Sequence, residues 1–150
     1  LLNQAQVFDM KMYYISYGSN LNIHNMKKRC PYAFPVYKLD GIKVNKLINY
    51  RLVFNKYATL IYKKNSIVPI GLWKITKKCE KNLDIYEQFP LIYEKKYIQI
   101  YKFKAMVYIM RSNKIKNPSK IYFDEILKGY KDFDLDIKYL YSSLKNKKLF

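Results

Sequence analysis

The chain has 150 residues and a mass of 18.2 kDa, and half of its residues are hydrophobic. That length suits one domain with a buried core and excludes a linker or a disulfide miniprotein. Apolar runs are only a few residues long, far short of the roughly 20 that a membrane span needs. We expect a single domain over residues 12–150 that makes no membrane contact. Residues 1–11, which begin with Leu1, are interpreted as an N-terminal extension or a remnant of cloning.

The net charge of +18 is the main argument for a nucleic-acid partner, because clustered basic side chains release counterions from phosphate. Only three of the 29 basic residues are arginine, however, and the lysines are scattered singly and in pairs. Lys, Asn, Ile, Tyr and Phe fill more than half of the positions, as A- and T-rich codons would dictate. We therefore expect a solvated lysine coat, able to steer acidic small molecules toward a cleft, and no nucleic acid.

Cysteine and histidine are too scarce for most catalytic chemistry. Cys30 and Cys79 stand 49 positions apart without companions at metal-ligand spacing, and His24 is the single histidine. We expect two buried thiols in a reducing, cytoplasmic compartment rather than a disulfide. We also expect no metal and no cofactor, and a surface position for His24.

The first strand and the turn that follows it are the clearest local signal. Residues 12–17 (MYYISY) are β-branched and aromatic and predict a strand that ends at Gly18-Ser19-Asn20. Asn20 is expected to cap a short helix to about Arg29, which Pro31 ends. Further strands are expected at 36–39, 50–54, 58–62, 67–75, 93–101 and 104–110. The segments 58–62 and 67–75 would form a hairpin about residues 63–66.

Three helices are predicted in the second half. Thr76 is expected to cap a helix over 77–86, which Pro90 ends, and Ser119 a helix to Lys128 with Gly129 just beyond its end. A last helix is expected over 135–145. Many short strands with inserted and appended helices predict an α+β domain built on an antiparallel sheet or small barrel.

The turn Gly18–Leu21 joins a strand to a helix start. Amides at a helix N-terminus are unpaired and attract a carboxylate or phosphate, and Gly18 permits the tight backbone that this needs. The motif is too short for a dinucleotide fingerprint and lacks the lysine of a P-loop. Anion binding and an ordinary capped turn both remain open on this evidence.

A longer series of residues resembles the γ-glutamylcyclotransferase-like superfamily over about residues 12–145. The matching residues are YYISYGSNL (13–21), Met26, Arg29-Cys30-Pro31, Ala33, Gly41, Tyr50-Arg51-Leu52, Ala58-Thr59-Leu60, Gly71-Leu72-Trp73, LDIYE (83–87), Pro90, Tyr93, Ala105, Tyr108-Ile109-Met110, Pro118-Ser119, Tyr122, Ile126 and Gly129-Tyr130. The resemblance implies a small, mostly antiparallel β-barrel flanked by a few α-helices. It also implies an intramolecular reaction in which the α-amino group of a γ-glutamyl substrate attacks its own γ-carbonyl, giving 5-oxoproline and a free amine.

The resemblance also assigns roles. Glu87 corresponds to the family's acid/base glutamate, although from the residues alone it is more simply a helix-end surface charge. By the same analogy, the pocket would be lined by Tyr17, Gly18, Ser19, Asn20 and Leu21, with the amides of 18–21 binding the substrate's α-carboxylate. Tyr93 and Tyr108 would point into the cavity and orient the substrate or hydrogen-bond Glu87.

Some residues depart from the family pattern or are expected to have structural roles. Gln88 stands where many members have glycine, and Ser66 where a turn glycine is common. Trp73 is expected in the core. Arg51 and Arg111 could meet a carboxylate of an extended substrate, but solvent or a salt bridge is the expected environment for both. Of the other glutamates, Glu80 and Glu94 are expected to be exposed, and Glu125 to pair with Lys128.

The YGSN-Leu motif and the C-terminal PS..Y...I..GY segment look more like the small γ-glutamylamine branch than the glutathione-degrading branch. The leading hypothesis is therefore a metal-independent cyclotransferase whose partner is a small γ-glutamyl compound. The alternatives are a non-catalytic protein of the same fold that binds a γ-glutamyl ligand and, less favoured, a basic nucleic-acid-binding module.

Overall fold

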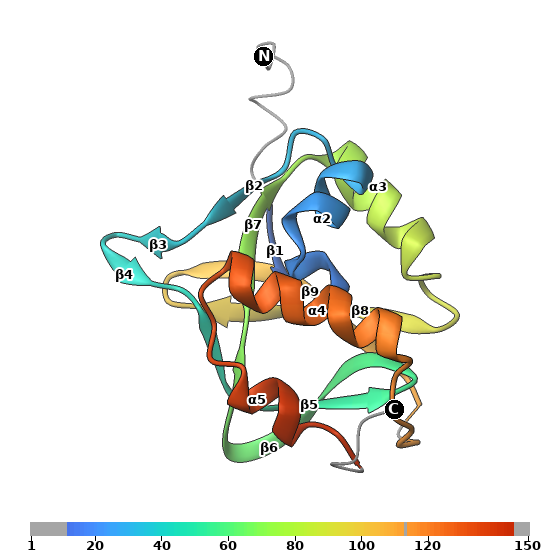
Figure 1. Cartoon of the computed structure of the whole chain (residues 1–150). Coiled ribbons are helices and arrows are strands. Elements are labelled where there is room, and N and C mark those ends of the chain that lie inside the picture. The colour runs from blue at the N-terminus through green and yellow to red at the C-terminus, as the bar shows by residue number, and fades with distance from the viewer. Residues whose placement is uncertain (1–11, 113, 146–150) are drawn as a thin grey trace.

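A computed structural model describes residues 12–112 and 114–145 (Figure 1). The strands are β1 (Met12–Ser16), β2 (Phe34–Val36), β3 (Lys38–Leu39), β4 (Ile42–Lys43), β5 (Lys46–Asn55), β6 (Tyr57–Pro69), β7 (Gly71–Ile75), β8 (Tyr93–Ile100) and β9 (Phe103–Met110). The helices are a 3-10 turn η1 (Ser19–Leu21), α2 (Ile23–Arg29), α3 (Lys77–Tyr86), α4 (Lys120–Asp132) and α5 (Lys138–Ser142). The predicted extension at residues 1–11 lies outside the described residues.

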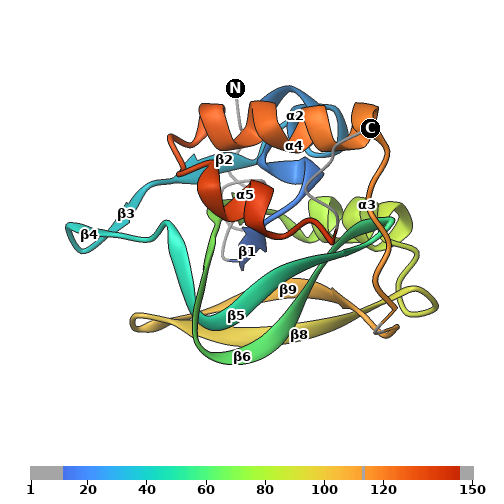
Figure 2. The same ribbon diagram turned by 60° about the horizontal axis from the view of Figure 1, so that its bottom comes forward.

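The central sheet has five strands in the order β2-β7-β1-β9-β8. β1 pairs antiparallel with β7, Tyr14 facing Trp73, and parallel with β9, Tyr14 facing Met106. In Figure 2, α2 and α4 lie on one side of the molecule and β8 and β9 on the other, with β1 between them. The mixed α+β class with a mostly antiparallel sheet is therefore confirmed.

The expected barrel is wrong, because the sheet is open. β5 and β6 form a separate two-stranded ribbon and do not continue the central ladder. The ribbon is joined to the sheet through a side chain: the Met110 amide on β9 donates to the Thr59 hydroxyl on β6 over 2.8 Å. The strands thus curve around the core without closing.

The expected hairpin about residues 63–66 is also wrong. β6 pairs with β5 on both sides of these positions, and residues 63–66 form a bulge that lies opposite Asn49 alone. β7 leaves to join β1 and β2. Asn65 does take a turn-like positive φ of 67°, but its amide is bound by the Asn49 side chain at an irregularity in the ribbon. The polar residues 63–65 face solvent, where their unpaired groups can be hydrated.

The helix caps are confirmed at two positions and corrected at a third. The side chains of Thr76 and Ser119 accept the Cys79 and Tyr122 amides at the starts of α3 and α4. At α2 the cap is Asn22 rather than Asn20, because η1 intervenes between the first strand and the helix. The last helix, α5, is shorter than the predicted 135–145.

Gly129 lies inside α4, not beyond its end as predicted. A Cβ on Gly129 would lie 2.5 Å from the Leu21 Cβ and 2.6 Å from the Asn22 amide nitrogen, so only glycine lets α4 press onto η1. The glycine serves a close contact between elements, and α4 continues to Asp132.

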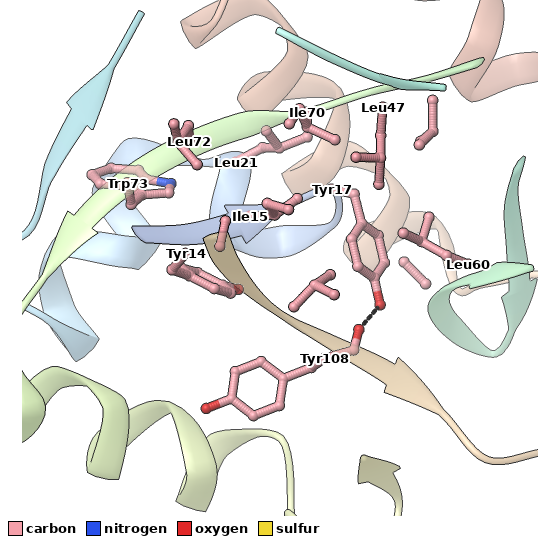
Figure 3. Close-up of a cluster of buried hydrophobic side chains, with 14 of the residues drawn as sticks. Tyr14, Ile15, Tyr17, Leu21, Leu47, Leu60, Ile70, Leu72, Trp73 and Tyr108 are labelled. Atoms are coloured by element: carbon pink, nitrogen blue, oxygen red, sulfur yellow. Dashed lines mark hydrogen bonds between the residues drawn. The ribbon is translucent and has the colours of Figure 1, made fainter. Parts of the chain in front are cut away.

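The core lies between the sheet and the helices, and its centre is drawn in Figure 3. Trp73 is fully buried, as predicted, and its indole N–H donates to the Ser16 hydroxyl over 3.1 Å. The Tyr17 side chain reaches across from the end of β1 and donates to the Tyr108 carbonyl on β9, the dashed line in Figure 3. This bond anchors the start of the turn to the sheet.

The two cysteines do not remain thiols as expected. Cys30 and Cys79 form a disulfide, with their Cα atoms 5.1 Å apart. The pairing follows from the tertiary fold, which places the end of α2 beside the first turn of α3. Among the described residues, no helix is long and apolar enough to cross a membrane, and no His, Cys, Asp and Glu cluster suited to a metal is found.

Candidate active site

A cavity of about 620 Å³ opens beside the turn that follows β1. It is bounded by that turn, the β5–β6 turn, the end of α3, and the facing ends of β8 and β9. Seven of the eight predicted site residues line it, namely Tyr17, Gly18, Ser19, Asn20, Glu87, Tyr93 and Tyr108. Its volume is within the range of about 300–1,000 Å³ usual for small-molecule sites.

Leu21 is the predicted site residue that does not line this cavity. Its side chain is fully buried and packs against the positions of Gly71 and Gly129. Its amide donates to the Gly18 carbonyl over 3.0 Å, closing the 3-10 turn. The candidate donors for an anion are therefore the amides of Gly18, Ser19 and Asn20.

Glu87 ends α3, and its amide donates to the Leu83 carbonyl over 2.8 Å. The carboxyl group is partly buried, and this desolvation raises its pKa to about 7, against the opposing effect of the Arg29 cation. A carboxyl poised near neutrality can both accept and donate a proton, as a general acid/base requires. Among the described residues that line the cavity, Glu87 is the one with an acidic side chain.

The chain leaves Glu87 through a left-handed turn. Gln88 has φ of 50°, a conformation that glycine adopts most easily, and its carbonyl accepts the Ile92 amide over 3.0 Å. Gln88 thus adopts a backbone conformation that glycine would favour at this position. The Gln88 side chain adds to the lining of the cavity instead.

Gly18 is required by close approach. A Cβ there would lie 3.0 Å from the Ala58 Cβ on β6 and 3.4 Å from the Tyr122 hydroxyl on α4. That hydroxyl in turn accepts the Ala58 amide over 3.0 Å. The turn is thus pressed against two elements that are far away in sequence.

Arg29 is a residue that sequence reasoning missed as part of the site. Its guanidinium donates to the Asn20 side-chain oxygen over 2.7 Å and lies 3.5 Å from the centre of the Tyr86 ring. The Asn20 amide group donates to the Tyr14 hydroxyl over 3.0 Å, and Ser19 and Tyr86 share a hydroxyl–hydroxyl bond of 2.9 Å. The turn and the end of α3 are therefore locked together. The one sign of its importance in the sequence was that Arg29, together with Cys30 and Pro31, belongs to the series of residues that resembles the family.

The two predicted tyrosines have partners other than Glu87. The Tyr93 hydroxyl donates to the Ala58 carbonyl over 2.6 Å, and the Tyr108 hydroxyl donates to the Asp84 carboxylate. Burial raises the pKa of both phenols well above the ordinary value, so both stay neutral at physiological pH. Their rings form walls of the cavity, and the expected hydrogen bond to Glu87 is not made.

Several other side chains lie away from the centre of the site. His24 is exposed on α2, as predicted, and Arg51 is exposed on β5, whereas Arg111 reaches the cavity rim. Glu80 is less exposed than expected, because Lys95 holds it in an ion pair of 2.8 Å. Lys128 pairs with Asp132 rather than with Glu125, at 2.6 Å.

Comparisons with solved structures find the same fold. A protein titled Gamma-glutamyl cyclotransferase superposes with a TM-score of 0.73 and 21% identity, over 88% of this chain and 85% of its own. An uncharacterised protein from Homo sapiens gives 0.70 and 21% over the same shares. YkqA from Bacillus subtilis gives 0.66 and 15%, over 87% of this chain and 52% of its own.

The sequence comparisons identify the family. No curated protein matches this chain. The family model described as Gamma-glutamyl cyclotransferase, AIG2-like matches residues 14–128, which include both the turn after β1 and Glu87. With a match over most of its length and the same fold in solved structures, the chain belongs to the γ-glutamyl cyclotransferase, AIG2-like family.

Proposed function

We propose that this protein is a γ-glutamyl cyclotransferase that acts on small γ-glutamyl amides, with Glu87 as the general acid/base. One observation carries the proposal: a partly buried carboxyl with its pKa raised to about 7 shares a cavity with the amides of Gly18, Ser19 and Asn20. Membership of the cyclotransferase family supports the same reaction class.

The turn would bind the γ-glutamyl head. The α-carboxylate would accept hydrogen bonds from the amides of Gly18, Ser19 and Asn20. These amides lie at the start of a helical turn, where backbone N–H groups attract an anion. Arg29 and Tyr14 hold the Asn20 side chain, so the turn is fixed before the substrate arrives. Such fixed orientation is worth about 7–11 kcal/mol in well-aligned intramolecular reactions.

The reaction would form one C–N bond and break another. The Glu87 carboxylate takes a proton from the substrate's α-ammonium, and the freed amine attacks the γ-carbonyl carbon. Collapse of the tetrahedral intermediate breaks the bond to the leaving nitrogen, which receives a proton from Glu87. A second proton lost by the ring nitrogen completes the departing ammonium. Because the substrate supplies its own nucleophile, no nucleophilic side chain is required.

The tyrosine walls would shape the bound substrate. Tyr93 and Tyr108 are neutral and each is fixed by a hydrogen bond, so their rings keep constant positions beside Glu87. A bent substrate that brings its α-nitrogen to the γ-carbon fits such a walled site better than an extended one. We propose that these two rings exclude water and orient the substrate.

The test is the release of 5-oxoproline by the purified protein. Mass spectrometry after incubation with γ-glutamyl dipeptides, ε-(γ-glutamyl)-lysine, γ-glutamylated small amines and glutathione should detect product with at least one of the first three. Glu87→Gln keeps the shape of the side chain and removes the base, so turnover should fall by about 10² or more.

The matched control is Glu94→Gln, which makes the same change at a glutamate on β8 outside the cavity and should leave turnover unchanged. Equal 5-oxoproline release by Glu87→Gln and the parent would show that Glu87 is not the acid/base. A thermal shift with a γ-glutamyl compound, without product, would indicate the non-catalytic binding protein instead.

A further inference from the structure

The rim of the cavity carries three cations without matching acids. Lys56 comes from the β5–β6 turn, and Arg111 and Lys116 come from the segment after β9. All three are exposed, and none forms an ion pair with a carboxylate within the described residues. Among the described lining residues, only Glu87 carries a carboxyl. The rim is therefore strongly positive.

Backbone hydrogen bonds join the segments that carry Lys56 and Lys116. The Lys56 amide donates to the Lys116 carbonyl over 2.8 Å, and the Lys116 amide donates to the Phe54 carbonyl over 2.9 Å. A parallel bridge joins Asn55 to Lys116 at the same place. Both lysines line the cavity, so both positive charges attract an anion bound there.

Arg111, the third cation, is anchored to the loop before β8. Its Nε–H donates to the Pro90 carbonyl over 3.0 Å, and its two terminal NH₂ groups take no part in that bond. A guanidinium fixed at one edge is well suited to binding a carboxylate or phosphate with the other edge. Three cations therefore surround the outer part of the cavity.

The proposed chemistry places the leaving group at this rim. If the γ-glutamyl head lies on the turn of Gly18–Asn20 with its γ-carbonyl beside Glu87, the rest of the substrate must extend along the remaining lining. That lining runs from the β5–β6 turn to the residues after β9. The cavity of 620 Å³ is large enough for a leaving group of substantial size.

We infer that the amine released by this enzyme carries acidic groups, and that two acidic groups serve better than one. The inference rests on the proposed function and specifies its substrate class. An amine with a free ammonium, such as the lysine part of ε-(γ-glutamyl)-lysine, meets repulsion at the same rim. Long-range attraction by the cations would also speed the arrival of the acidic substrates.

A ladder of three compounds of nearly equal shape tests the inference. γ-Glutamyl-glutamate carries two negative charges on the leaving part, γ-glutamyl-glutamine carries one, and γ-glutamyl-glutaminamide carries none. We expect kcat/KM for 5-oxoproline release to fall in that order, by about two- to fivefold per charge. The preference should shrink when the salt concentration rises, because salt screens exposed charges.

Two pairs of exposed lysines provide the matched variants. Lys56→Gln/Lys116→Gln removes the paired cations of the rim, and Lys63→Gln/Lys64→Gln removes two exposed cations of β6 outside the cavity. The rim variant should lose most of the preference for γ-glutamyl-glutamate over γ-glutamyl-glutaminamide. The control pair should keep the preference. Equal thermal unfolding midpoints establish that both variants are folded.

The outcomes separate the two proposals. Equal kcat/KM for all three compounds, or an unchanged preference in the rim variant, overturns the acidic leaving group and leaves the cyclisation standing. No 5-oxoproline from any of the three, or from the wider panel, overturns the proposed function and the inference with it.

Discussion

The acid/base chemistry proposed here depends on the opposing influences on a single carboxyl group. Burial at the end of α3 raises the pKa of Glu87 to about 7, while the Arg29 cation acts in the opposite direction. Arg29 also binds Asn20, so one side chain influences both the proton chemistry and the shape of the turn. The two roles are separable by mutation.

At this scale we predict the pH dependence of kcat/KM. Glu87 must be ionised to accept a proton. The plot of kcat/KM against pH should therefore have an acidic limb that begins near pH 7 and falls about tenfold per pH unit below it. Arg29→Met removes the cation that lowers the pKa of Glu87, so the limb should move to higher pH. The measurement is kcat/KM for 5-oxoproline release between pH 5 and 9.

Asn20→Ala is the matched control, because it breaks the same hydrogen bond but keeps the cation. Its activity should fall while the limb stays in place. A limb that does not move in Arg29→Met would contradict the electrostatic role of Arg29, whatever the loss of activity.

Among the elements, the contact between α4 and η1 positions the substrate-binding turn. Gly129 allows the backbones to approach, and two turns earlier on the same helix the Tyr122 hydroxyl reaches Ala58 beside Gly18. The turn therefore depends on a helix that begins about a hundred residues later in the chain. Packing, not local preference, holds Gly18–Asn20 in place.

Gly129→Ala should therefore destabilise the protein although alanine is the better helix former. The added Cβ would lie 2.5 Å from the Leu21 Cβ, so the elements must separate, at a cost of about 1–3 kcal/mol in the free energy of unfolding. Urea denaturation measures this cost. Lys131→Ala, at an exposed position of the same helix, should change the free energy by less than about 0.5 kcal/mol. An unchanged or increased stability in Gly129→Ala would exclude the close contact.

For the molecule as a whole, the disulfide ties α2 to α3 across 49 residues. The bridged segment contains the β5–β6 ribbon and β7. Residues of the candidate site lie just outside both ends of this segment: Arg29 directly before Cys30, and Glu87 at the far end of α3. A covalent link of this kind restricts the unfolded chain and thereby favours the folded state.

Reduction should therefore lower the stability of the intact protein. We expect the free energy of unfolding to fall by about 2–4 kcal/mol on treatment with dithiothreitol, measured by urea denaturation with and without the reductant. Cys30→Ser/Cys79→Ser should give the same loss without the reductant and should not respond to it. Two reactive thiols in the denatured, unreduced protein would contradict the bridge.

The local elements of this protein could be predicted from its sequence. The first strand, predicted over residues 12–17, the caps at Thr76 and Ser119, and the separate strands β8 and β9 follow from side-chain preferences that act over a few residues. The resemblance added Glu87 and the turn after β1 as candidates, and these residues do line one cavity. Their catalytic roles stay predictions until activity is measured.

Tertiary packing decided the features that local patterns left open or predicted wrongly. Residues 63–66 form a turn by preference, but β5 pairs with β6 on both sides of them, so they become a bulge within the ribbon and not the tip of a hairpin. Gly129 has the signature of a helix end, yet it serves a close contact with Leu21. Cys30 and Cys79 gave no sign of their pairing, because only the folded chain brings α2 beside α3. Arg29 joined the site for the same reason: its partners, Asn20 and Tyr86, lie 9 and 57 positions away, and no local rule relates them.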